Sequence, residues 1–159
     1  MNVLMSIKKK WATQILMGTK KFEFRKSFPD EVDKIFLYVS YPQKEIIGYI
    51  TTDCIYKAMI KDLREYTQKE WADFDSEKDG FDSYFRIKPQ GVAIKIKDVF
   101  IFDKPINPFE FEGFAPPQSY YILNKDLEKF ILGKIWIILV SFNLAQTGGS
   151  RLGLNVTII

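Results

Sequence analysis

The sequence predicts an α+β domain in which a small, partly closed β-barrel carries helices packed at its side. Along the 159 residues, stretches with the apolar pattern of strands outnumber stretches with helical periodicity. The helical stretches fall between the first few strands, an order typical of a single mixed domain. With 47% apolar and 27% charged residues, the chain has a globular composition and is long enough to bury a core.

The first part of the chain alternates strand and helix. Val3–Ile7 is a short apolar run that predicts a strand. In Lys8–Met17 the apolar residues recur at helical spacing, and Gly18 can end that helix in the left-handed conformation. In Phe22–Arg25 apolar and charged residues alternate, which predicts a strand with one face of each kind. Further strands are expected at Ile35–Val39 and at Glu45–Ile55, where Gly48 indicates a bulge or bend.

The middle of the chain predicts a long helix, a regular strand and an irregular segment. Ala58–Phe74 has helical spacing, Asp75–Gly80 is an acidic loop, and Phe81–Phe85 fits one helical turn. Gly91–Phe102 alternates apolar and polar residues and predicts the most regular strand. The irregular segment that follows is punctuated by Pro105, Pro108, Pro116 and Pro117.

The C-terminal stretch Phe130–Leu144 is almost wholly apolar. It is shorter than the ~20 residues that span a bilayer, so we expect a buried strand or a homodimer contact rather than a membrane segment. We therefore divide the chain into a domain over residues 1–125 and an apolar extension over 126–159, whose role stays open. Because Met1–Ile7 is too short for the apolar core of a signal peptide, we expect a cytoplasmic protein.

The composition excludes several kinds of chemistry. The chain has no histidine, which excludes Ser-His-Asp and Cys-His triads and argues against a zinc site. Cys54 is the single cysteine, so no disulfide can form within the chain. Acid–base chemistry would need Lys, Glu, Asp, Tyr or a chain terminus, and we expect neither a metal nor another cofactor. A net charge of +3 is compatible with a nucleic-acid partner and equally with an ordinary soluble protein.

The strand after the first helix carries the densest polar cluster. A strand places Lys21, Glu23 and Arg25 on one face, with neighbours about 7 Å apart. Lys20 can join them only from the turn before the strand. If the face points to water, it is a solvated edge with no further role. If it points into the mouth of a barrel, Arg25 orients Glu23, and Lys20 or Lys21 supplies charge for a phosphate or a carbonyl.

A basic run, Lys8-Lys9-Lys10, begins the helix that leads to this cluster. It lies at the same end of the molecule as any site built on the first strand, so a nucleic-acid phosphate could bind there. Aromatic side chains could stack on bases nearby, although each also suits a core position. The candidates are Trp11, Tyr38, Tyr41, Tyr84 and Phe85.

The opening of the chain resembles one known family. The run Leu4-Met5-Ser6-Ile7-Lys8, the pair Trp11-Ala12 and the segment Ile15–Arg25 resemble the start of ASCH domains of bacterial and phage type, which are PUA-like barrels. The family signature G-x-K-x-x-E-x-R is met by Gly18, Lys20, Glu23 and Arg25. The resemblance extends over about residues 3–122, including Ile46-Ile47-Gly48, Gly91–Ile96 and Pro116-Pro117-Gln118-Ser119-Tyr120. Lys9 departs from the pattern, because proline is common at that position.

This resemblance implies a cleft beside the first helix that binds RNA or another nucleic acid, including a modified base, in a regulator of transcription or RNA. The residues that would bind are Lys8, Lys10, Trp11, Lys20, Lys21, Glu23, Arg25, Tyr41, Gln118 and Ser119.

The family also implies an alternative, a hydrolase with Lys20 and Glu23 as catalytic residues. Some relatives are amidohydrolases that deacetylate N4-acetylcytidine with a lysine, a threonine and a glutamate, and others are reported as ribonucleolytic. Lys20 matches the lysine, whereas Glu23 stands where the amidohydrolases carry threonine. Their glutamate would fall near Glu77 or Asp79. The missing threonine favours binding over hydrolysis.

Overall fold

The fold is described from a computed structural model over residues 1–145, without the side chains of residues 76–79 and 136–145. Residues 146–159, the last part of the expected apolar extension, lie outside the described residues. The elements in chain order are β1 (Asn2–Ile7), α1 (Lys9–Leu16), β2 (Phe22–Arg25), β3 (Lys34–Val39), β4 (Glu45–Met59), α2 (Ile60–Glu70), the 3-10 helix η1 (Ala72–Glu77), α3 (Lys78–Phe85), β5 (Gln90–Ile106), the 3-10 helix η2 (Pro108–Glu110), β6 (Tyr120–Ile122) and α4 (Lys125–Ala145).

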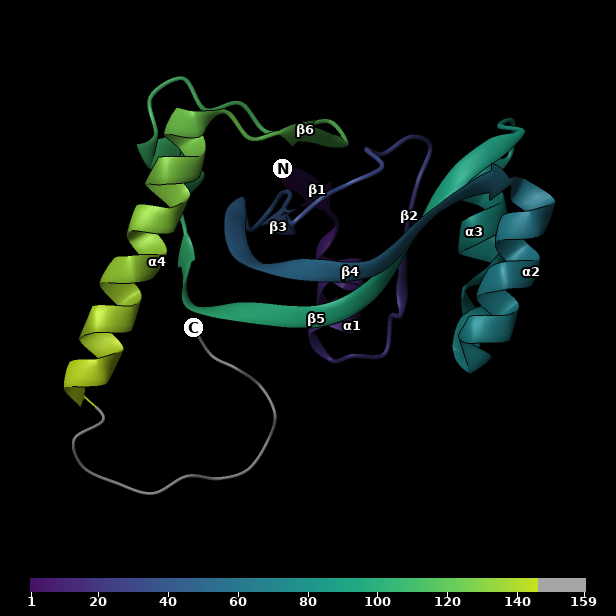
Figure 1. Ribbon diagram of the computed structural model, residues 1–159, viewed down its shortest axis with the longest axis horizontal. Helices are drawn as coiled ribbons and strands as arrows, with labels where there is room; N and C mark the ends of the chain where they lie inside the picture. The colour runs from purple at the N-terminus through teal and green to yellow at the C-terminus, as the bar shows by residue number, and fades with distance from the viewer. Residues whose placement is uncertain (146–159) are drawn as a thin grey trace.

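The strands form one curled sheet in the order β2-β5-β4-β3-β1-β6. All pairs are antiparallel except β1 with β3, which run parallel. The sheet curls into a half-barrel with the helices packed alongside it, which confirms the predicted α+β class. The long strands β4 and β5 cross the whole molecule, and their far end carries α2 and α3 at the opposite side from α4 (Figure 1). We call this far end, with α2, η1 and α3, the arm.

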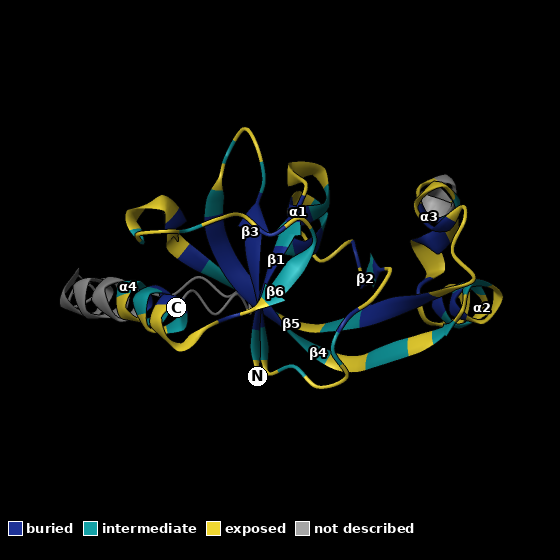
Figure 2. Cartoon of the chain, turned by 90° about the horizontal axis from the view of Figure 1, so that it is seen from above, coloured by how far each residue is buried: buried dark blue, intermediate teal, exposed yellow. Residues whose placement is uncertain are grey.

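The central strands are buried on both faces. On β1, Met5 packs in the cluster that α1 covers, while the adjacent Leu4 packs in the cluster that α4 covers. On β3, Leu37 and Phe36 divide between the same two clusters. Burial on both sides explains why these strands read as continuous apolar runs. Figure 2 shows this buried centre, with exposed residues concentrated in the loops and the outer helices.

The predicted irregularity at Gly48 is confirmed. The pairing register shifts at this point of β4 against both neighbouring strands. A Cβ atom at Gly48 would lie 2.1 Å from the carbonyl oxygen of Phe100 on β5. Glycine is therefore required here by the close approach of the two backbones.

The arm differs from its sequence prediction at the element boundaries. β4 continues to Met59, so α2 begins at Ile60, two residues after the predicted helix start, and it ends at Glu70 instead of Phe74. The predicted acidic loop at 75–80 is helical, formed by the end of η1 and the start of α3. The reason is tertiary: Phe74, Phe81 and Phe85 must all reach one apolar cluster with Phe22 of β2, and helical turns bring them there.

The prediction of a buried strand within residues 130–144 is wrong, because this segment belongs to the helix α4. The helix starts ahead of the apolar run, where Asn124 Oδ1 accepts a hydrogen bond of 2.8 Å from the backbone N–H of Leu127. Leu127, Ile131 and Ile135 then recur every fourth residue and are buried against the outer face of the sheet. Within residues 1–145, no helix combines the length and apolar character needed to cross a bilayer.

We predict that Gly48→Ala lowers the free energy of unfolding by about 1–3 kcal/mol, because the added methyl group meets an immovable backbone carbonyl. Gly133→Ala in α4 is the matched control. No atom lies within 4 Å of its added Cβ, so we expect a gain of about 0.5–1 kcal/mol. Urea denaturation of both variants measures these changes, and equal stability of the two would contradict the close approach at Gly48.

Candidate functional site

The turn between α1 and β2 positions Lys20. Gly18 has φ of 71°, and its N–H donates to the carbonyl of Ile15, while the N–H of Thr19 donates to that of Gln14. These two bonds form a left-handed C-terminal cap that reverses the chain. The N–H of Lys20 also donates to the Gln14 carbonyl, at 3.1 Å. The predictions that Gly18 ends the helix and that Lys20 enters the cluster from the turn are confirmed.

The two faces of β2 have different surroundings. Phe22 packs into the apolar cluster of the arm, and Phe24 packs against it. Glu23 and Arg25 lie opposite Ile94 and Val92 of β5, and residues directly opposite in an antiparallel pair share a face. Those two partners belong to the cluster under α1, so the polar side chains of β2 face the interior of the curled sheet.

The cluster of Lys20, Glu23 and Arg25 is buried, so of the two alternatives for this strand the solvated edge is wrong. The three residues are 6%, 6% and 8% exposed. Lys20 Nζ lies 3.7 Å from Glu23 Oε2, and Arg25 Nη2 lies 2.9 Å from Glu23 Oε1. Lys21 is exposed, so the second cation beside the carboxylate is Lys20. One carboxylate between two cations leaves a formal charge of +1.

Arg25 also joins two strands that do not pair. Its Nη2 donates to the Ser6 carbonyl at 2.8 Å, and its Nε lies 3.2 Å from Met5 Sδ. Met5 and Ser6 are on β1, which lies at the other side of the sheet order from β2. The guanidinium therefore spans the opening of the half-barrel, at the C-terminal end of β1.

Aromatic rings surround the ammonium group of Lys20. The Nζ atom lies 4.8 Å from the ring centroid of Trp11, 5.3 Å from that of Phe24 and 5.8 Å from that of Trp71. Trp11 is half-buried, and Lys10 Nζ lies 4.3 Å from the same ring. Such cation–π contacts attract the ammonium group to the ring faces and help to hold it in place. Phe24 and Trp71 were not among the predicted site residues.

Tyr84 of α3 brings the arm to the cluster. Burial raises the pKa of its hydroxyl above the ordinary value, and the nearby positive charge of Arg25 opposes that rise. Lys26 Nζ lies 5.2 Å from the centre of its ring. The sequence indicated Tyr84 only as one of several aromatic residues that could stack on bases.

The remaining predicted residues lie around the same end of the molecule. Lys8 is exposed at the start of α1. Tyr41 is 79% exposed in the turn after β3, next to Ser40, whose N–H donates to the Ile7 carbonyl. Ser119 accepts a 2.9 Å hydrogen bond from the N–H of Ser6, which places it and the exposed Gln118 beside the residue that also receives Arg25.

Two aromatic candidates are core residues. Tyr38 and Phe85 are both 2% exposed and therefore cannot stack on a base. The side chains of Glu77 and Asp79, where a catalytic glutamate was expected, lie outside the described residues.

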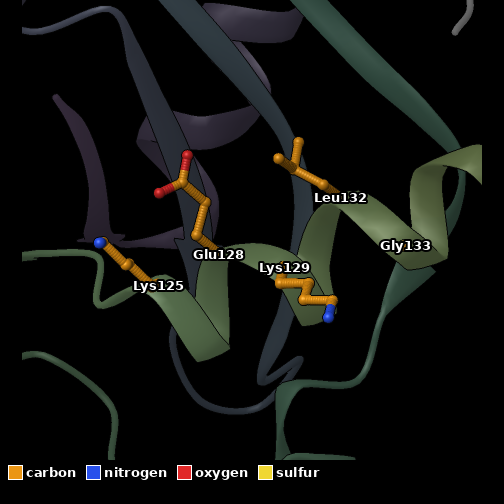
Figure 3. Close-up of a pocket in the computed structure, with 5 residues that line it drawn as sticks. All are labelled: Lys125, Glu128, Lys129, Leu132 and Gly133. Carbon is orange, nitrogen blue, oxygen red and sulfur yellow. The ribbon is translucent and has the colours of Figure 1, made fainter.

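A shallow surface depression on α4 contains none of these residues. It is lined by Lys125, Glu128, Lys129, Leu132 and Gly133 (Figure 3). The carboxylate of Glu128 accepts a 2.5 Å hydrogen bond from Asn2 Nδ2 of β1, and the amine of Lys129 points to the opposite side from that carboxylate. Because α4 packs on the opposite face of the sheet from α1, this depression is separate from the buried cluster.

The chain is similar to a known family and to solved structures. The profile of the ASCH domain matches residues 5–100. The crystal structure of an ASCH protein from Zymomonas mobilis is 25% identical, with a TM-score of 0.69, covering 83% of this chain and 94% of that chain. A serine-to-alanine variant of that protein is 24% identical, with a TM-score of 0.71, covering 84% and 95%. No curated protein matches the chain.

We predict that Arg25→Gln lowers the free energy of unfolding by about 3–5 kcal/mol, because it removes one partner of a buried ion pair and the link to β1. Arg64→Gln is the matched control. Its pair with Asp82 is partly exposed, at 28% and 42%, so we expect a loss of at most about 1 kcal/mol. Denaturant titration compares the two, and a similar loss in both would show that Arg25 adds no particular stability.

Proposed function

The chain belongs to the ASCH domain family, and we propose that it binds RNA through the buried cluster of Lys20, Glu23 and Arg25 and the basic surface beside it. The family is usually linked to RNA binding. The observation that carries the proposal for this chain is the cluster itself. A positively charged group of polar side chains is held, 6–8% exposed, inside an otherwise apolar half-barrel. Burying charged side chains costs folding free energy, so recognition explains their presence here better than stability does.

The surroundings of the cluster fit a nucleic-acid strand. Lys8, Lys9 and Lys10 are exposed at the start of α1 and can neutralise phosphates. Trp11 lies between that run and Lys20 and offers a half-exposed ring on which a base can stack. Tyr41, Gln118 and Ser119 lie at the same end and supply further stacking and hydrogen-bonding groups.

The depth of the cluster favours an unpaired base as the group recognised. Bases paired within an RNA duplex cannot reach side chains that are more than nine-tenths buried, whereas unpaired bases of loops and single strands can be splayed out. Lys20 and Arg25 would donate to carbonyl or ring-nitrogen acceptors of the base, and the carboxylate of Glu23 would accept from an exocyclic amine. A modified base falls within this class. The role we propose is therefore regulation of transcription or RNA by binding.

One observation favours a second candidate, a hydrolase of RNA or of a modified nucleoside. Lys20 Nζ and Glu23 Oε2 are buried 3.7 Å apart, and in a chain without histidine such a pair is the available acid–base machinery. Against it, Glu23 Oε1 also lies 2.9 Å from Arg25 Nη2, so both carboxylate oxygens already have a cationic partner.

We predict that the protein binds a single-stranded RNA of about 16 nucleotides, with an affinity that falls as salt rises. Fluorescence anisotropy from 50 to 300 mM salt measures both. Single-stranded DNA and duplex RNA of the same sequence test the preference for an unpaired ribose strand. Absence of salt-dependent binding to any of the three at low ionic strength would overturn the proposal.

We predict that Lys20→Gln weakens RNA binding by about tenfold, because it removes a buried donor that faces the base. Lys21→Gln is the matched control, since it changes the same charge one residue away on an exposed side chain, and we expect at most about a twofold loss. Circular dichroism melts establish that both variants are folded. Equal losses would mean that only general charge matters and would contradict recognition by the cluster.

The same two variants separate binding from hydrolysis. If the protein releases acetate from N4-acetylcytidine or cleaves RNA, chromatography of the products detects it, and Lys20→Gln abolishes that turnover while Lys21→Gln does not. Turnover of this kind would replace the binding proposal by the hydrolase, and binding without any product would remove the hydrolase.

A further inference from the structure

A second basic surface lies where β2 ends beside the start of β5. In the antiparallel ladder Arg25 pairs with Val92, so Lys26, the next residue, lies beside the turn that leads into β5. In that turn Arg86 and Lys88 are exposed, and Ile87 between them is 83% exposed. Tyr84 completes the surface, because the residue is 37% exposed and Lys26 Nζ lies 5.2 Å from the centre of its ring. We call Lys26, Tyr84, Arg86, Ile87 and Lys88 the arm-end patch.

The cations of the arm-end patch have no acidic partners among the described side chains. Lys26, Arg86 and Lys88 form no ion pair there. Two acidic groups on neighbouring elements are paired with other residues: Asp82 with Arg64, and Asp30 with Lys57. Asp62 in the first turn of α2, which lies beside Pro89, forms no ion pair with a described side chain. The three cations, none paired with a described side chain, therefore give the patch positive charge around an exposed tyrosine and an exposed isoleucine.

The patch is continuous with the buried cluster. The positive charge of Arg25 opposes the rise in the pKa of the Tyr84 hydroxyl, and Lys26, the next residue, has its Nζ atom 5.2 Å from the centre of the Tyr84 ring. On the other side of the cluster, Lys20 and Lys10 both lie against Trp11. The cluster thus lies between two basic surfaces, each with a half-exposed aromatic residue: Trp11 at α1 and Tyr84 at the arm.

We propose that the arm-end patch is a second contact surface for single-stranded RNA, which holds the part of the strand that lies beyond the base in the cluster. This rests on the proposed function. Arg86 and Lys88 contact phosphates, the ring of Tyr84 stacks on an unpaired base in place of Lys26, and Ile87 packs against a base or ribose. A strand that enters over the lysines of α1 then crosses the cluster and leaves over the arm.

The double variant R86Q/K88Q tests this inference without disturbing the fold, since both side chains are exposed. For a 16-nucleotide oligouridylate we expect about tenfold weaker binding and a slope of log affinity against log salt that is smaller by ~1.4, which corresponds to two phosphates. For an oligouridylate of about four nucleotides, long enough for the cluster but not for both surfaces, we expect no change.

The charge-matched control is K61Q/K69Q, which removes two exposed lysines from α2 of the same arm. We expect its affinity and salt slope for the 16-nucleotide RNA to stay within about twofold of the parent chain. Equal effects of the two double variants, or no effect of R86Q/K88Q, overturn the inference and leave the patch to an acidic protein surface, while the proposed function stands. Failure of the unaltered protein to bind either RNA overturns the proposed function as well.

Ultraviolet crosslinking supplies a readout that general charge does not affect. With a 16-nucleotide RNA containing 4-thiouridine, we expect crosslinks to the peptide that contains Tyr84 as well as to the peptide that contains Trp11. Tyr84→Ala should remove the first crosslink and retain the second. Crosslinks confined to Trp11 would contradict a strand that passes over the arm.

Discussion

The environment of one carboxylate, Glu23, determines how this end of the molecule is built. A charged group that is 6% exposed is tolerated only with close partners of opposite charge. Its partners come from different places: Lys20 from the capped turn after α1, and Arg25 from two residues further along β2. Each partner is fixed in turn, Lys20 by aromatic rings and Arg25 by the backbone of β1. The carboxylate therefore links the first helix, the edge strand and the first strand.

This arrangement closes the half-barrel with side chains instead of backbone hydrogen bonds. Among the strands of residues 1–145, β2 pairs only with β5, and Arg25 provides the contact from β2 to β1. The guanidinium uses one backbone acceptor of β1, the Ser6 carbonyl, where a continuous ladder would use several. If the cluster binds RNA as we propose, stability and recognition depend on the same few atoms, a combination found at functional sites.

The sequence predicted the local features of the site better than its surroundings. The cap at Gly18, the strand Phe22–Arg25 and the bend at Gly48 each follow from a residue type with a specific backbone requirement, and all three are confirmed. Whether β2 faced water or the interior could not be decided from alternation, because both faces of β2 are covered, one by the arm and one by the sheet interior. Trp71, between α2 and η1, and Tyr84 of α3 are distant in sequence, and no local pattern places them beside Lys20 and Arg25.

For α4 the local sequence pattern was misleading, because the apolar run predicted a strand where the structure has a helix. A nearly continuous apolar run fits a buried strand or a helix equally well. Two features favour the helix: the cap at Asn124 and the four-residue spacing of Leu127, Ile131 and Ile135. The cap lies before the apolar run that begins at Phe130, and the spacing starts before it, so the run alone does not contain the helical signal.

The strand order also has a consequence for how the chain folds. Glu23 finds its ladder partner Ile94 only after β3, β4, α2, η1 and α3 have been made. Closing so long a loop costs chain entropy and is slow, because the favourable contacts form only when β5 pairs with both β4 and β2. On the ribosome, the charged residues of β2 therefore emerge early and remain in water until the second half of the domain follows. The segment Gly18–Arg25, which meets the family signature, is therefore among the last to reach its final surroundings.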